Sequence, residues 1–320
     1  KQRLINTVHD HRISHAQLFL GPQGSGKLAM ALAYAQYINC SGRSNGNACG
    51  SCPSCIKYQK LIHPDLHFIF PVATTKKVTR NPVSKNFYKE WRELLPETHY
   101  YPSLSDWYKK MEIENKQAII NAEDCSEIIR TLSYKSYESE YKVMIIWMVE
   151  KLFHSAAPKI LKILEEPPEK TLFILISENQ DQIINTILSR TQIVKFPVLK
   201  DEDIREYLDK RNICGNYDEA AMLRIAGGNL RKAMLFAKDS GSDSANFDLF
   251  TRWMRLCYKI KVREVADFAD QMARNGREAQ KNFLNYAMHF MRQCLMRHFK
   301  EDRDISLNAR ELDFSKNFYP

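Results

Sequence analysis

A glycine-rich loop between an apolar run and a helical segment constrains the fold of this chain more than any other feature. The loop follows the apolar run Gln17–Leu20 and precedes a helix-forming run over residues 28–37. Its glycines let successive backbone N–H groups face a phosphate, and the helix N-terminus adds positive potential. We therefore predict an α/β domain with a P-loop. Its nucleotide-binding residues are Gly21, Gly24, Ser25, Gly26 and Lys27.

The residues around this loop argue against ATP hydrolysis. An active P-loop has Ser or Thr after the lysine to bind Mg²⁺, whereas this chain has Leu28. A second acidic element is expected where an apolar strand ends. The best strand candidate begins at Lys142 and reaches its first carboxylate only at Glu150. A displacement of three or four residues moves a side chain by roughly 10 Å along a strand. We predict that this site does not hydrolyse ATP. The alternative that Glu150 takes the place of the missing strand-end carboxylate stays open.

The eight cysteines are unevenly placed. Cys40, Cys49, Cys52 and Cys55 fall within sixteen residues, and the other four are scattered. The chain opens with no secretory leader, so we favour a metal site over disulfides. Four thiolates with short spacings fit one tetrahedral ion and leave no position for water, which predicts a structural zinc site. Four reduced thiols and a redox pair are the alternatives.

The composition changes along the chain indicate three domains. Residues 1–197 alternate apolar runs, at 17–20, 143–149, 172–177 and 192–196, with helical patterns, as in a mostly parallel sheet with crossover helices. Residues 198–240 contain polar helical segments and predict a small helical domain. Residues 241–320 have apolar residues at three-to-four spacing, which predicts an all-α domain that we expect to be truncated.

A segment over residues 70–110 departs from the pattern of the first domain. It contains four prolines and many aromatic residues without clear periodicity. We interpret it as an insertion that packs on the first domain or projects from it.

The charge balance and hydropathy limit the classes of partner. Lys and Arg number 47 against 38 Asp and Glu, so the net charge is +9. This excess permits a polyanionic partner without requiring one. The longest strongly apolar stretch, residues 143–149, is much shorter than the roughly 18 residues of a membrane span. We expect a cytoplasmic protein without a membrane partner. No basic block interleaved with aromatics supports a stand-alone nucleic-acid binder.

Four motifs together resemble the AAA+ subunits of the bacterial replicative clamp loader. They are residues 12–27, the four-cysteine insert, residues 156–168 ending in Leu-Glu-Glu-Pro-Pro, and Leu188-Ser-Arg-Thr-Gln192, in this order. The resemblance spans about residues 1–235. It implies an AAA+ domain at 1–197 with a zinc module at 40–55, a helical lid domain at 198–240 and a collar-type helical domain at 241–320 for oligomerisation.

This family contains ATP-hydrolysing gamma/tau subunits and a delta-prime subunit that lacks hydrolysis. The family's acidic pair falls on Trp147 and Met148, and its P-loop Ser or Thr falls on Leu28. Both losses resemble delta-prime, and a gamma/tau-like ATPase is the alternative. The resemblance implies a subunit of the cytoplasmic DNA polymerase III replisome, at the bacterial nucleoid. Its partners would be gamma/tau and delta subunits, and through them the sliding clamp and primed DNA.

Two arginines gain roles from the resemblance. Arg190 matches the arginine of the family's Ser-Arg-Cys element, which enters the ATP site of the neighbouring subunit. A planar, permanently charged guanidinium suits a γ-phosphate, although a surface ion pair is its structural alternative. Arg231 resembles the lid-domain sensor arginine that reaches nucleotide in cis, and a purely structural role is equally open. ATP binding without hydrolysis is the expectation for the P-loop.

Two acidic residues and the end of one predicted strand are not expected to act in catalysis. Glu165 and Glu166 would lie in the last turn of a helix capped by Ser155 and stopped by two prolines. We expect them to be structural or interface charges. Residues 177–179 occupy the place of the family's polar sensor, a role that loses its purpose without hydrolysis.

Overall fold

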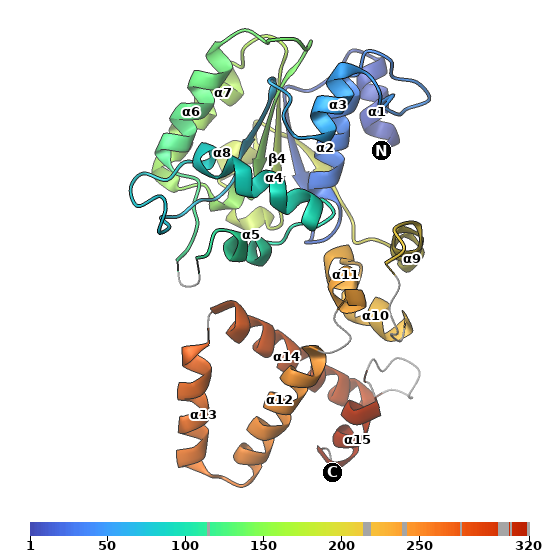
Figure 1. The fold of residues 1–320 in the computed structure, drawn as a ribbon, viewed down its shortest axis with the longest axis vertical. Coiled ribbons are helices and arrows are strands. Elements are labelled where there is room, and N and C mark those ends of the chain that lie inside the picture. The colour runs from blue at the N-terminus through green and yellow to red at the C-terminus, as the bar shows by residue number, and fades with distance from the viewer. Residues whose placement is uncertain are drawn as a thin grey trace. The chain divides into compact units, whose positions relative to one another are not determined.

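The structure, a computed structural model, describes residues 1–113, 116–213, 219–238, 242–275, 277–299, 307 and 309–318. The chain divides into two compact units, Lys1–Val198 and Leu199–Pro320, which Figure 1 shows as ribbons. Within the described residues, no helix combines the length and apolarity needed to cross a bilayer.

A parallel five-stranded sheet forms the centre of the first unit. A mostly parallel sheet was predicted, from apolar runs that correspond to four of these strands. The strands are β1 Ala16–Leu20, β2 Leu66–Ile69, β3 Lys142–Trp147, β4 Thr171–Ser177 and β5 Gln192–Lys195, in the order β2-β3-β4-β1-β5. Leu18 of β1 lies opposite Leu175 of β4 and Ile193 of β5. Every residue of β1, β3 and β4 is buried, as is typical of parallel strands covered on both faces.

Helices cover both faces of this sheet (Figure 1). Because side chains alternate along a strand, Leu172 and Ile174 of β4 enter one apolar core and Phe173 enters the other. The first core also contains residues of α1 Gln2–His9, α2 Lys27–Ile38, α3 Pro53–Gln59, α4 Tyr88–Glu97 and α5 Leu104–Lys110. The second contains residues of α6 Ala122–Ser133, α7 Ala157–Glu165 and α8 Asn185–Leu188.

The segment over residues 70–110 packs into the first core. Trp91 of α4 and Trp107 of α5 are fully buried. Their rings lie 4.5 and 4.9 Å from the ring of Phe70, measured between centroids. Trp91 also lies 5.1 Å from Trp147, at the end of β3. These contacts connect the segment directly to the central sheet.

Helix α7 begins later than its sequence suggests. A 3₁₀ turn, η3 His154–Ala156, contains Ser155, and the α-helix starts at Ala157 without a side-chain cap. The predicted Ser155 cap is therefore wrong, because this residue lies inside the preceding turn. Similar 3₁₀ turns are η1 Ser84–Phe87, η2 Val149–Lys151 and η4 Gln180–Gln182.

The described residues of the second unit form helices α9 to α15. They are α9 Asp201–Lys210, α10 Glu219–Ala226, α11 Leu230–Lys238, α12 Ser242–Tyr258, α13 Val262–Arg274, α14 Arg277–Phe299 and α15 Ala309–Phe318. Gly227 and Gly228 have φ angles of 53° and 78° and separate α10 from α11, where a side chain would be strained. An aromatic core around Phe250 and Phe290, 4.8 Å apart, joins α12 and α14.

Candidate functional site

The glycine-rich loop connects β1 to α2 at the carboxyl edge of the sheet, where ligands of open α/β sheets bind. Gly24 and Gly26 have φ angles of 76° and 83°, which favour glycine. Gly21 has a different constraint: a methyl group placed on it would lie 2.2 Å from the carbonyl oxygen of Phe196. The first glycine of the loop is thus required by packing against the chain after β5.

Lys27 is directed into its own loop. Its Nζ donates hydrogen bonds to the carbonyl oxygens of Gly21, at 2.7 Å, and Pro22, at 2.6 Å. The residue is 5% exposed. Burial lowers the pKa of its ammonium group, and the nearby carboxylates of Glu178 and Glu150 act in the opposite direction.

The residue after the lysine and the two residues on which the resemblance places the family's acidic pair carry apolar side chains. Leu28 follows the lysine, β3 ends at Trp147, and Met148 comes next, all of them buried. Glu150, the alternative acidic residue, lies in turn η2, and its Oε1 accepts a hydrogen bond from the N–H of Glu178 at 3.0 Å. The structure brings Glu150 near Lys27, but as the acceptor of a backbone bond.

Ser177, at the strand end predicted as a polar sensor, forms hydrogen bonds within the turn that follows the strand. The hydroxyl of Ser177 donates to the carbonyl oxygen of Asn179 and accepts a bond from its N–H, each at 3.2 Å. Both bonds stabilise the turn after β4.

Arg190 follows α8 and is held by acceptors on two helices. Its Nε donates to Oε1 of Glu165, at the end of α7, at 2.5 Å. A second guanidinium nitrogen donates to the carbonyl oxygen of Thr186 at 3.0 Å and to the hydroxyl of Ser189 at 3.2 Å. The arginine side chain is 33% exposed. Glu165 is therefore one half of an ion pair, a partnership that was not identified from the sequence.

The four clustered cysteines meet in space. Their sulfur atoms all lie within 4.8 Å of one another, with Cys40 and Cys49 3.5 Å apart and Cys49 and Cys55 3.9 Å apart. A zinc ion with Zn–S distances of about 2.3 Å has sulfurs about 3.8 Å apart. The fourth thiol, Cys52, caps α3 by accepting a bond from the N–H of Cys55. This cluster has the ligand set and the dimensions of a tetrahedral metal site.

Local hydrogen bonds prepare part of this cluster for metal binding. The N–H groups of Ser51 and Cys52 lower the pKa of Cys49 to about 6. Burial raises the pKa of Cys55 to about 12. A bound dication favours the thiolate form of each ligand, so metal binding would release protons.

Arg231 belongs to the second unit, in the first turn of α11, and is 9% exposed. The helix start is capped, because Oδ1 of Asn229 accepts a bond from the N–H of Lys232 at 3.1 Å. The two glycines before Asn229 fix the entry to this helix, and the carbonyl oxygen of Gly228 accepts a bond from the N–H of Leu199.

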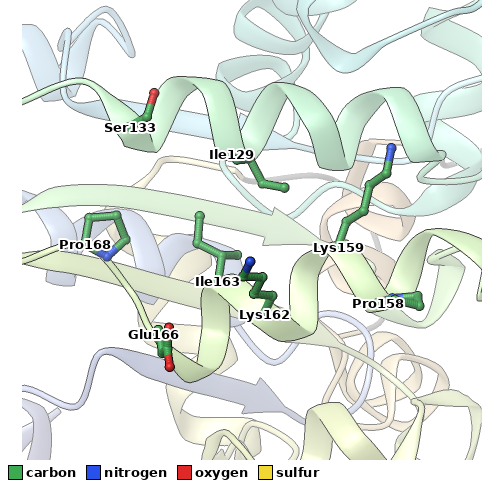
Figure 2. A pocket seen from close by; sticks show the side chains of 8 residues that line it. All are labelled: Ile129, Ser133, Pro158, Lys159, Lys162, Ile163, Glu166 and Pro168. Atoms are coloured by element: carbon green, nitrogen blue, oxygen red, sulfur yellow. The ribbon is translucent and has the colours of Figure 1, made fainter.

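A cavity of about 540 Å³ lies between α6 and α7, and its lining includes none of the predicted nucleotide, zinc or arginine-finger residues. Ile129 and Ile163 give it an apolar wall, and Lys159, Lys162 and Glu166 supply its charged groups (Figure 2). Lys159 is already occupied, since its Nζ donates to the hydroxyl of Ser126 at 2.8 Å.

The chain is similar to subunits of DNA polymerase III. The sequence profile of the family described as DNA polymerase III, delta subunit, matches residues 1–200. The delta-prime subunit of Bacillus subtilis is 28% identical over 210 residues, 66% of this chain and 50% of that protein. A gamma/tau subunit of Mycobacterium tuberculosis is 25% identical over 270 residues, 82% of this chain and 39% of that protein. The chain thus spans half or less of the length of these relatives.

Solved structures give weaker likenesses. A gamma-subunit-related protein of Thermotoga maritima has a TM-score of 0.41 at 13% identity, covering 99% of this chain and 90% of its own. The RuvB branch migration motor of the same organism has a TM-score of 0.39 at 12% identity, covering 78% and 59%.

Proposed function

Since the chain belongs to the family described as DNA polymerase III, delta subunit, we propose that it is a delta-prime-like clamp-loader subunit that does not hydrolyse ATP. In this proposal it joins gamma/tau and delta subunits in a hetero-oligomeric ring of the cytoplasmic replisome. The ring uses ATP to load the sliding clamp on primed DNA. This chain contributes Arg190 to the ATP site of a neighbouring subunit.

One observation carries the proposal that hydrolysis is absent. Leu28, Trp147 and Met148 are buried apolar residues. The resemblance to the family places them where a hydroxyl and an acidic residue would hold Mg²⁺ and a second acidic residue would activate water. Without the metal, charge that develops on a γ-phosphate has little to stabilise it.

The setting of Arg190 supports a role in a neighbouring ATP site. Its guanidinium is partly exposed and oriented by Glu165 and by Thr186. An exposed ion pair contributes about 1 kcal/mol or less, so a phosphate dianion can compete with Glu165 for the arginine.

ATPase measurements test this proposal. The isolated chain should show no DNA-stimulated turnover. An arginine finger contributes roughly 10³ to 10⁵ to kcat at its site, so Arg190→Ala should nearly abolish turnover at the one ATP site that Arg190 enters and lower the ATPase rate of the reconstituted loader by at least the share of that site. Arg130→Ala is the matched control, because Arg130 is also an exposed arginine paired with a glutamate. Normal ATPase activity of the Arg190→Ala loader would reject the finger role.

A gamma/tau-like ATPase is the second candidate function. The proximity of Glu150 to Lys27 favours it, as does the longer match to the gamma/tau relative. Steady ATP turnover by the isolated chain that disappears in Lys27→Ala would support this alternative and overturn the first proposal.

We also propose that Cys40, Cys49, Cys52 and Cys55 hold a structural zinc ion. Purified protein should contain about one zinc ion per chain, and Cys52→Ser should reduce this content. The exposed Cys257, outside the cluster, provides the control variant Cys257→Ser. Metal analysis that finds no zinc in protein purified without chelators would contradict the assignment.

A further inference from the structure

The phosphate loop is covered by another part of the same chain. The cavity left at the loop has a volume of about 20 Å³. Its lining includes Gly24, Gly26 and Lys27 of the loop together with Tyr100, Tyr101 and Pro102. A cavity of this size holds about one water molecule, whereas sites for organic ligands measure roughly 300 to 1,000 Å³.

Tyr101 makes the closest approach to the loop. A methyl group placed on Gly26 would lie 3.2 Å from the Tyr101 hydroxyl oxygen and 3.4 Å from the ring carbon Cε1. The ring is therefore in van der Waals range of the last glycine before Lys27. A triphosphate bound to the N–H groups of this loop would need the same space.

The covering segment is anchored at both ends. On one side it follows α4, whose Trp91 is fully buried. On the other side it leads into α5, where Trp107 is fully buried and its Nε1 donates to the carbonyl oxygen of Pro71 at 2.7 Å. Ser103 caps α5 by accepting a bond from the N–H of Asp106 at 3.0 Å.

The backbone between these anchors is fixed as well. His99 and Tyr100 have φ angles of 51° and 67°, a conformation that side chains adopt only when their surroundings impose it. The N–H of Tyr100 donates to the carbonyl oxygen of Leu95 at 2.7 Å, and that of Tyr101 to Thr98 at 2.9 Å. Moving the segment away from the loop would break these bonds.

We propose that Tyr100–Pro102 closes the phosphate loop to nucleoside triphosphates, with the ring of Tyr101 occupying space that the phosphates need. The inward bonds of Lys27 to Gly21 and Pro22 agree with this, because the ammonium group is already bonded within the loop. The proposed function excludes hydrolysis only, and this inference extends it to the exclusion of binding.

Binding of a fluorescent ATP analogue (mant-ATP) to the full chain tests the inference, with and without Mg²⁺. Wild type and the control Tyr101→Phe, which keeps the ring, should show no binding at millimolar ATP. Tyr101→Ala should lower the dissociation constant at least tenfold, and this gain should disappear in the double variant Tyr101→Ala, Lys27→Ala. A second variant, the triple substitution Tyr100→Gly, Tyr101→Gly, Pro102→Gly, removes the whole cover.

Two results would overturn the inference. One is Lys27-dependent binding of ATP to the wild type as tight as to Tyr101→Ala. The other is no gain of binding in either opened variant, in protein whose thermal unfolding remains cooperative. The ATPase assay of the Arg190→Ala loader measures turnover at the site of a neighbouring subunit, whereas the mant-ATP experiment measures binding to this chain. The closed loop can therefore be disproved without disproving the proposed function.

Discussion

Asp65, just before β2, is a buried carboxylate that fixes a loop distant in sequence. The residue is 2% exposed. Its oxygens accept hydrogen bonds from the N–H groups of Tyr137, Glu138 and Ser139 at 2.6, 2.9 and 2.9 Å, and from the Ser139 hydroxyl at 2.9 Å. Burial alone would raise the pKa of Asp65, but the hydrogen bonds outweigh it and lower the pKa below the ordinary 3.8.

We expect Asp65→Asn to reduce the free energy of unfolding at neutral pH by about 2 to 3 kcal/mol, because hydrogen bonds to a charged group contribute about 1.5 to 3 kcal/mol. The folded-state pKa lies below the unfolded one. The stabilisation is therefore complete above about pH 4 and is lost as the pH falls through the folded-state pKa. Urea denaturation of both proteins at neutral pH and near pH 3 measures this. A difference that does not shrink at low pH would contradict the carboxylate role.

A functional residue could be predicted from the sequence when its whole site is built from one short segment of the chain. The spacing of Gly21 to Lys27 and of the four cysteines is visible in the sequence, because each site is built from one short segment. The partner of Arg190 is Glu165, twenty-five residues away. The cover over Gly26 is Tyr101, farther still. Such pairings arise only when separate elements are packed together, so the sequence pattern carries no signal for them.

Helices α4 and α5 belong to the core of the first unit, and this has a measurable consequence. Trp107→Ala should lower the free energy of unfolding by about 3 to 5 kcal/mol, because it leaves a cavity and removes the bond to Pro71. Tyr137→Ala, at a residue 81% exposed, should change it by less than about 0.5 kcal/mol. Chemical denaturation followed by circular dichroism compares the variants. A loss below about 1 kcal/mol for Trp107→Ala would mean that the segment is only appended.

Secondary structure was predictable where apolar runs were long enough to stand out. The runs at 17–20, 143–149, 172–177 and 192–196 correspond to β1, β3, β4 and β5. Strand β2 was missed, because His67 interrupts its short apolar run. It lies at the edge of the sheet and pairs with β3. The helices between residues 70 and 110 were also missed, although the buried Trp91, Leu94 and Leu95 of α4 recur at the three-to-four spacing of a helix.

The chain as a whole separates its chemistry between two units with their own cores. The phosphate loop, the thiol cluster and Arg190 all belong to the first unit, and Arg231 belongs to the second. The aromatic core of α12 and α14 is independent of the sheet. In the function proposed above, the second unit would hold the subunit in the ring and the first would present Arg190.

The net charge of +9 over 320 residues permits non-specific contact with DNA phosphates without requiring it. Non-specific binding to phosphates has dissociation constants of about 10⁻⁴ to 10⁻⁶ M at physiological salt and weakens steeply as salt rises. We expect the chain alone to bind a labelled primed template in this range, and the assembled loader with ATP to bind it much more tightly. Fluorescence anisotropy at several salt concentrations measures both. Nanomolar binding by the chain alone would favour a stand-alone nucleic-acid binder, because recognition of the junction would then need no ring.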